Sequence, residues 1–464
     1  MRHFLDLNYD VLHLIVTLLS RNDILRLALS CRMGFDLALP QILYRVKLRN
    51  IRILDPYRLC DFCSFVLADV VQRGPLLRIL ELDLEMYTVH RRLDNLRIGE
   101  YVFPTALTKI LEHASNLREL AFKLPEKLIQ DHPSLLSAAV ALPHLDSLRV
   151  STSALGQTII SSMISRPRRL ALNSHRTTSN CSWDTLVSSL LQSGVTAYVE
   201  NLHLIGDRYL SAMPSLKFPW LRHLAISKSH IPFGSSFDLA VACPNLHSIH
   251  WEANYIHRER NSSTTLDKNI VSITTRLELD HVHLRRCDIL PVVGPVRRLT
   301  LTSLYDQFET ENIATALGRA APVILHVNTT GNNLDLAQLP AVAPSIRFLR
   351  LQVHPTWVNY RPPLSLCEMP LKAVSILVEV HCREKYDSKV GSLLAEQAAR
   401  DIPSVEYVEV NLCAYRPSPY YDHQRDRTAW HRVTSREADK CTVEKLPQWE
   451  SDKVEDRLLA MTRV

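Results

Sequence analysis

The chain has 464 residues, more than one ordinary globular domain contains, so it forms either several domains or one elongated array of repeats. Hydrophobic residues at 46% and charged residues at 22% are typical of an ordinary soluble protein. The formal net charge is only +6 and no dense run of lysine and arginine occurs, so the composition does not indicate nucleic-acid binding.

The sequence predicts neither export nor membrane insertion. Residues 1–6 lack a basic segment followed by an uninterrupted apolar stretch, which argues against a signal peptide. No run of about 18 apolar residues predicts a membrane span. The ten cysteines are scattered, and without a secretion signal we expect them to be reduced thiols. We therefore expect an intracellular protein, cytoplasmic or nuclear, that does not bind a membrane.

The first 45 residues form a block of three short predicted helices. Residues 9–19 carry the broad apolar stripe of a core-facing helix. After an interruption at residues 20–22, Asp23 is predicted to cap a second helix that is rich in aliphatic residues. Three short helices cannot bury so many aliphatic side chains among themselves. The surplus predicts a docking face.

A repeating unit begins at Leu77, with aliphatic residues at positions i, i+3 and i+5. The middle aliphatic recurs at positions 80, 120, 148, 170, 202, 224, 249, 277, 299, 325, 349, 374 and 408. The mean interval is about 27 residues, which is within the range of leucine-rich repeats. Five of these residues follow a proline by five positions, where it ends the preceding helix. The pattern predicts an α/β solenoid with a curved parallel sheet along its concave side.

The predicted domain boundaries follow from these two patterns. Residues 1–50 form the helical block, and residues 51–413 form the solenoid. Residues 414–464 contain few aliphatic side chains, so they predict a polar, mobile tail with a possible short helix at 454–461.

The N-terminal block resembles the F-box, by which substrate receptors attach to the Skp1 adaptor of SCF-type ubiquitin ligases. The family pattern Leu-Pro-x-Glu-Leu-Leu-x-x-Ile-Leu-x-x-Leu, then an Asp-Leu-Leu-x-Leu helix and a Cys-Arg step, is similar to residues 7–19 and 23–32. Asn8 replaces the usual proline, and Gly34 replaces a bulky hydrophobic residue. The residues that the resemblance places at the adaptor contact are Leu7, Val11, Leu12, Ile15, Leu19, Leu25, Leu27, Cys31 and Phe35.

The resemblance implies a substrate-recognition subunit that binds a Skp1-like adaptor and, through it, a cullin. The solenoid is then expected to bind a protein substrate through outward-pointing strand residues, since side chains alternate along a strand. The candidates are His203, His223, His250, Glu252, Glu278, Asp280, Arg298 and Arg350. Two alternatives stay open: the block could be a cap that shields the first repeat, and the chain could be a leucine-rich-repeat scaffold acting without a ligase.

No catalytic signature occurs in the sequence, so we expect no enzyme, catalytic residue or cofactor. Cys60 and Cys63 form a lone Cys-x-x-Cys pair, which favours packed thiols over a zinc site because no second ligand pair follows. His281 and His283 have no carboxylate or thiol at metal-ligand spacing. We expect no metal site. An enzyme hidden in a divergent repeat array is the remaining alternative.

Overall fold

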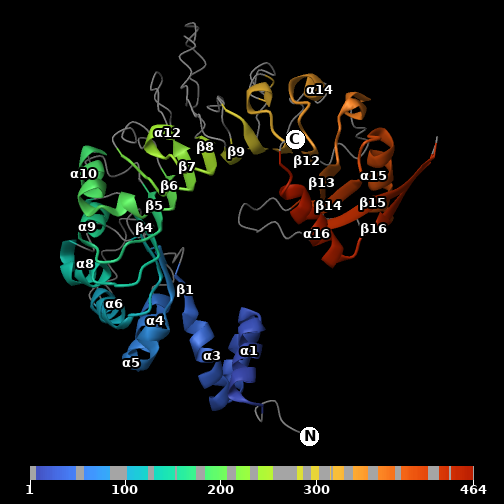
Figure 1. Ribbon diagram of the computed structural model, residues 1–464. Helices are drawn as coiled ribbons and strands as arrows, with labels where there is room; N and C mark the ends of the chain where they lie inside the picture. The colour runs from blue at the N-terminus through green and yellow to red at the C-terminus, as the bar shows by residue number, and fades with distance from the viewer. Residues whose placement is uncertain are drawn as a thin grey trace. The chain divides into compact units, whose positions relative to one another are not determined.

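A computed structural model describes most of the chain (Figure 1). The described residues are 7–48, 57–83, 102–123, 130–151, 154–173, 183–205, 216–229, 239–253, 279–285, 294–302, 314, 317–328, 338–353, 364–381, 388–415, 428–437 and 440–462. They divide into two compact units. The first comprises residues 1–206 and 215–221, and the second comprises residues 207–214 and 222–464.

The first unit begins with three helices, α1 (Tyr9–Leu18), α2 (Arg21–Ser30) and α3 (Arg32–Tyr44). Asn8 caps α1, because its Oδ1 atom accepts a hydrogen bond from the backbone N–H of Asp10 at 2.9 Å. Ser20, not the predicted Asp23, caps α2. The Ser20 hydroxyl accepts from the Asp23 backbone N–H at 3.3 Å and donates to the Asp23 carboxylate at 2.6 Å.

A small core of its own holds the three helices together. Its buried members are Leu12, Val16, Ile24, Leu37 and Ala38. Gly34 of α3 lies close against Leu27 and Ser30 of α2. A Cβ atom at this position would lie 2.5 Å from the carbonyl oxygen of Leu27, which is too close for any side chain. Both departures from the F-box pattern therefore have a local structural reason: Asn8 caps a helix, and Gly34 allows a close helix contact.

Strand and helix then alternate through the rest of the first unit. The elements are β1 (Arg45–Leu48), α4 (Tyr57–Leu67), α5 (Val70–Arg73), β2 (Ile79–Asp83), α6 (Val102–His113), β3 (Glu119–Lys123), α8 (Pro133–Val140), β4 (Ser147–Ser151), α9 (Ala154–Ser162), β5 (Arg169–Asn173), α10 (Trp183–Ser193) and β6 (Asn201–Ile205). The strands pair in parallel and in chain order. One aligned, buried row consists of Val46, Leu80, Leu120, Leu148, Leu170 and Leu202.

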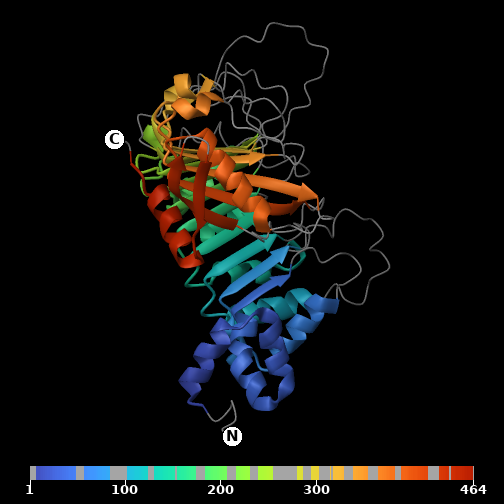
Figure 2. The same ribbon diagram turned by 90° about the vertical axis from the view of Figure 1, so that its right-hand side faces the viewer.

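The second unit continues the repeat pattern with eight parallel strands among its described residues. Its elements are β7 (His223–Ser229), α12 (Leu239–Ala242), β8 (Ser248–Ala253), β9 (Leu279–Arg285), β10 (Val296–Thr302), β11 (Ile324–Asn328), α14 (Leu339–Val342), β12 (Phe348–Val353), β13 (Ala373–His381), α15 (Ser388–Asp401) and β14 (Tyr407–Tyr415). Its buried row consists of Leu224, Ile249, Val282, Leu299, Leu325, Leu349, Val374 and Val408. Parallel strands connected by crossover helices confirm the predicted α/β repeat fold (Figure 2).

One predicted repeat phase is wrong. The aliphatic residue of β9 that aligns with Ile249 and Leu299 is Val282, whereas Leu277 lies outside the described residues. The cause is visible in the sequence, where aliphatic residues occupy the odd positions 271, 273, 277 and 279 and then the even positions 282 and 284. Alternation alone cannot decide which of the two sets faces the core.

The C-terminal segment differs from the predicted mobile tail. It contains two antiparallel strands, β15 (Thr428–Glu437) and β16 (Lys440–Lys445), and a helix, α16 (Gln448–Leu459). The few apolar residues of this segment are enough to order it because they pack onto the sheet. Trp430, Leu446, Val454 and Leu458 share a buried cluster with Phe348 of β12. None of the described helices is long and apolar enough to cross a membrane.

Candidate interaction surfaces

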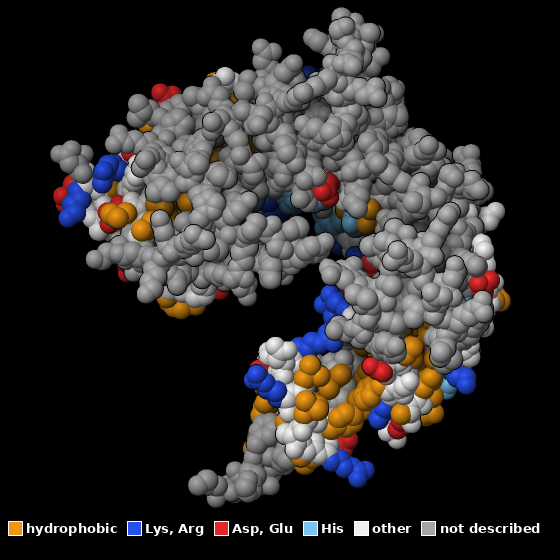
Figure 3. Space-filling model, turned by 180° about the vertical axis from the view of Figure 1, so that it is seen from behind, with side chains coloured by type: hydrophobic (Ala, Val, Ile, Leu, Met, Phe, Trp, Pro, Cys, Tyr) orange, Lys and Arg blue, Asp and Glu red, His pale blue; other side chains and the backbone are white. Residues whose placement is uncertain are grey.

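The N-terminal helices expose many large hydrophobic side chains. Leu14, Leu18 and Leu29 are 62%, 79% and 86% exposed, although the core of the block is filled by other residues. We define the N-terminal apolar patch as Leu7, Tyr9, Val11, Leu14, Leu18, Leu25, Leu29 and Met33. Figure 3 shows hydrophobic side chains gathered at the N-terminal helices. Large exposed apolar patches are a common feature of interaction sites, so this patch is a candidate docking surface.

The predicted adaptor residues fall into two groups. Leu7, Val11 and Leu25 are exposed and belong to the N-terminal apolar patch. Leu12 is 0% exposed and lies in the core of the block, so its side chain cannot contact a partner while the block is folded. Ile15 is half-buried.

The remaining predicted adaptor residues make contacts within the protein. Leu19 and Leu27 are half-buried and pack against its core. Cys31 is exposed, and its Sγ atom accepts a hydrogen bond from the backbone N–H of Gly34 at 3.3 Å, which caps α3. Phe35 contacts the ring of Phe65 edge to face, with ring centroids 6.3 Å apart. Sequence reasoning missed Leu14, Leu18 and Leu29 because α1 and α2 are apolar on more than one face, so periodicity does not identify the inner face.

The second unit has a sheet surface on the side away from its buried aliphatic row, and we call this surface the front face. It consists of the strand residues that alternate with the buried aliphatic row and therefore point to the other side of the sheet. One aligned row is Ala225, His250, His283, Thr300, His326, Arg350, Ser375 and Glu409. The neighbouring row is His223, Ser248, His281, Arg298, Ile324, Phe348, Ala373 and Tyr407.

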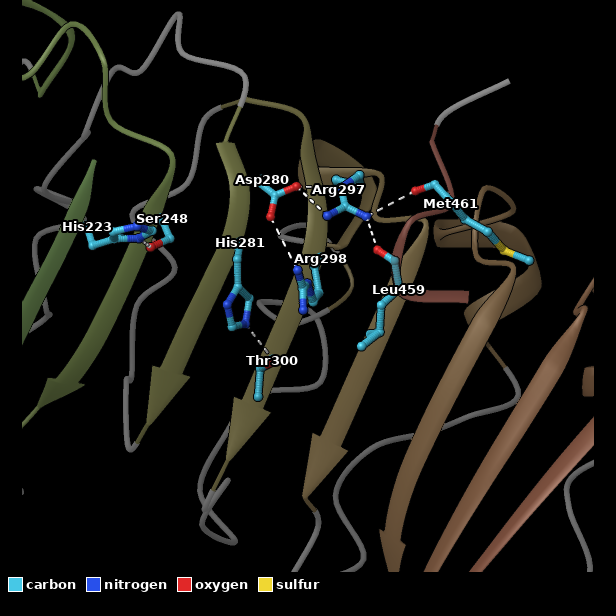
Figure 4. A network of polar contacts seen from close by, with 9 residues as sticks. All are labelled: His223, Ser248, Asp280, His281, Arg297, Arg298, Thr300, Leu459 and Met461. Carbon is cyan, nitrogen blue, oxygen red and sulfur yellow. Dashed lines mark hydrogen bonds and ion pairs between the residues drawn. The ribbon is translucent and has the colours of Figure 1, made fainter. Parts of the chain in front are cut away.

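Histidines crowd the part of the front face formed by β7 to β11. The rings of His250 and His283 meet edge to face with centroids 4.2 Å apart. His281 hydrogen-bonds through Nε2 to the hydroxyl of Thr300 at 3.1 Å, and His223 hydrogen-bonds through Nδ1 to Ser248 at 2.7 Å (Figure 4). Aligned parallel strands bring these side chains together although they are far apart in sequence.

Two of the histidines are held in the neutral form. Burial lowers the pKa of His281 to about 4, with a further contribution from the positive charge of Arg298. Burial likewise lowers the pKa of His326 to about 4, and the charge of Arg350 acts in the same direction. Among the described residues, no group of three or more His, Cys, Asp or Glu side chains could hold a metal ion. His281 and His326 are therefore neutral hydrogen-bonding groups at pH 7.

A charged network lies at the start of β9 and β10 (Figure 4). The carboxylate of Asp280 accepts hydrogen bonds from Arg297 and from Arg298, the latter at 3.3 Å. Burial opposes ionisation of Asp280, but the two arginines outweigh it and hold the pKa of this carboxyl below its ordinary value. Arg297 also donates to the carbonyl oxygens of Leu459 and Met461, so it caps the C-terminal end of α16.

Arg350 is fully engaged within the protein. Its guanidinium donates to the carboxylates of Glu409 and Glu455, each at 3.0 Å. Burial lowers the pKa of Arg350, but the two carboxylates outweigh this effect and raise it. Because Glu455 belongs to α16, this helix occupies the place where a ligand would reach Arg350. Arg350 therefore holds the fold together, in contrast to its predicted role in substrate contact.

The other predicted substrate residues are only partly brought together. His223, His250 and Arg298 lie on the front face of the second unit, and Glu252 follows His250 in the same phase on β8. His203 lies on β6 of the first unit. Glu278 lies outside the described residues.

Asp280 shares the phase of Val282 and does not belong to the front-face rows. Because the sequence predicted the wrong phase for β9, Asp280 was predicted to point outward and His281 and His283 were not. His281 and His283 occupy the front-face positions instead. Only the pairing of β9 with β8 and β10 identifies these two histidines as front-face residues.

Cys60 and Cys63 lie one turn apart on α4, and both are free thiols. Cys63 is buried, and this burial, together with the neighbouring Cys60, raises the pKa of its thiol to about 12. A thiol with so high a pKa supplies little thiolate for metal binding or disulfide exchange at neutral pH. The geometry favours packed helix thiols.

No protein-family model matches the chain, and no curated protein matches it. The F-box resemblance therefore depends on the residues of the N-terminal block themselves. The repeat architecture depends on the register of the strands, which is independent of that resemblance.

Proposed function

We propose that the chain is the substrate-recognition subunit of an SCF-type ubiquitin ligase. The N-terminal apolar patch binds a Skp1-like adaptor, and the adaptor attaches a cullin. The observation that supports this proposal is that Leu14, Leu18 and Leu29 remain exposed although the core of the block is already filled. A cap for the first repeat would bury its apolar side chains against that repeat instead.

The proposed role requires no bond chemistry by this chain. The repeat units hold a protein substrate, so that its lysines lie near a conjugating enzyme brought by the cullin. Proximity raises the effective concentration of these lysines and accelerates their modification. Cofactors and metals have no part in this mechanism.

Purified full-length chain mixed with Skp1 tests the proposal by size-exclusion chromatography and calorimetry. We expect a stoichiometric complex. The double variant Leu18→Asp, Leu29→Asp should bind at least about 30-fold more weakly, since a buried interface anchor contributes about 2 kcal/mol or more. The variant should fold normally because both side chains are exposed. Ile164→Asp, which changes an exposed residue elsewhere in the first unit, is the matched control and should bind as the unaltered chain does.

The outcome separates the ligase receptor from a scaffold acting without a ligase. Absence of a complex with the unaltered chain refutes the receptor proposal, as does an equal loss of binding in the Ile164→Asp control. A change at Leu12 cannot serve as the test. Leu12→Ala is expected to cost about 2–5 kcal/mol of stability by leaving a cavity, so any loss of binding would reflect unfolding.

A further inference from the structure

The parallel strands of the first unit carry outward rows of side chains, on the side of the sheet opposite the buried aliphatic row. One aligned outward row consists of Lys47, Glu81, Ala121, Arg149, Ala171 and His203. The row beside it, nearer the starts of the strands, includes Glu119, Ser147 and Arg169. These rows bring together charged side chains that are far apart in the sequence.

The carboxylates in the described part of these outward rows are already engaged in ion pairs. The pairs are Arg45 and Lys47 with Glu81 at 3.3 and 3.4 Å, Lys123 with Asp83 at 3.2 Å, and Arg169 with Glu119 at 2.6 Å. Glu81 serves two cations at once. The surface therefore carries more positive than negative charge, and no carboxylate remains for a further cation.

Arg149, in the middle of its row on β4, is the cation left over. It makes no hydrogen bond or ion pair within the described part of the chain. Its side chain is half-buried, but none of its nitrogen atoms is fully buried, so the guanidinium reaches solvent. A guanidinium holds its N–H donors in a planar fork that fits a carboxylate through two parallel hydrogen bonds.

The residues beside Arg149 are small. Ala121 on β3 and Ala171 on β5 align directly with it, and both are partly exposed. Neighbouring strands lie about 4.8 Å apart, so the next long side chains of this row begin only about 10 Å away on either side. In the adjacent row, Glu119 and Arg169 pair with each other across β4. A ligand group therefore meets only alanine next to the guanidinium, with an ion pair as the border on one side.

We propose that Arg149, with Ala121 and Ala171 beside it, binds a carboxylate of an acidic segment of a partner protein. One guanidinium matches the single charge of a carboxylate, whereas a phosphorylated segment is typically bound by a cluster of arginines. The carboxylate accepts two hydrogen bonds from the guanidinium, and the adjoining part of the segment lies over the alanines. The inference rests on the proposed function only in taking this segment to belong to the captured substrate.

A labelled peptide of alternating serine and glutamate residues serves as the probe, and its binding to the full-length chain is measured by fluorescence anisotropy. Alternation places the glutamates on one side of an extended peptide. We expect Arg149→Met to weaken binding at least about tenfold, because the charged hydrogen bonds are lost. Lys109→Met removes an exposed cation of α6 in the same unit and should bind as the unaltered chain does. Absence of binding to the unaltered chain, or an equal loss in both variants, overturns the proposal.

A matched peptide with phosphoserine in place of glutamate separates the carboxylate from a phosphate. We expect this peptide to bind no more tightly than the glutamate peptide, because the site offers only one unpaired guanidinium. Tighter binding of the phosphopeptide would assign the site to phosphate and overturn the proposed carboxylate.

Urea denaturation separates a binding role of Arg149 from a structural one. Arg149 has no partner to lose within the described part of the chain, so Arg149→Met should unfold at a urea midpoint no lower than that of the unaltered chain. A lower midpoint would show that Arg149 holds the fold together, and the proposal would fail. None of these experiments contains the adaptor, so this inference and the proposed adaptor binding can fail separately.

Discussion

Acidification between pH 6.5 and pH 4 should destabilise the second unit through His281 and His326, which are half-buried. The folded protein holds the pKa of His281 and of His326 at about 4, below the ordinary value of 6.5. In this pH interval the unfolded chain binds a proton at each histidine and the folded chain does not, so the free energy of unfolding decreases as the pH falls. Below about pH 4 both states are protonated and this loss stops growing. The difference between the two pKa values corresponds to about 3 kcal/mol for each histidine.

Urea denaturation of the full-length chain at intervals from pH 7 to pH 4.5 measures this effect. We expect His281→Gln and His326→Gln each to reduce the loss of stability over this range by about 2–3 kcal/mol, because glutamine does not titrate. An unchanged slope in both His281→Gln and His326→Gln would refute the assignment of these histidines as neutral groups in the folded protein.

Three further substitutions test the packing of the two units by urea denaturation. Arg350→Met should cost about 3–5 kcal/mol, because Glu409 is only 4% exposed and loses its partner; a cost below 1 kcal/mol would contradict the buried pair. Gly34→Ala should cost about 1–3 kcal/mol, because the new Cβ atom meets the carbonyl oxygen of Leu27, although alanine favours helix; a stabilised variant would contradict this close contact. Ser20→Ala should cost about 1 kcal/mol by removing the cap of α2, and no change would show that the cap contributes nothing.

The repeat phase is the property that the sequence predicted best. A buried aliphatic row requires one apolar residue at a fixed phase in every strand, and that requirement is local enough to be visible in the chain. Leu80, Leu120 and Leu148 of the first unit align as predicted. The prediction failed at β9, where two aliphatic sets in opposite phase follow each other and only pairing with β8 and β10 selects Val282.

The sequence also determined that the N-terminal block has more aliphatic side chains than it can bury. It did not determine which of them are left over, because α1 and α2 are apolar on several faces. Packing of the three helices buries Leu12 and leaves Leu18 exposed, so the tertiary structure assigns one to the core and the other to the surface.

The C-terminal segment shows the limit of composition as a guide. Few aliphatic residues after Ala414 predicted a mobile tail, since such a segment cannot form a core by itself. Val454 and Leu458 instead complete a core whose other half is Phe348 on a distant strand. The sequence by itself determined the helical block, the α/β repeats and their period, because these depend on local alternation. The tertiary structure decided which histidines meet on the front face and which part of it α16 covers, because strand register and long-range packing join residues that no local pattern connects.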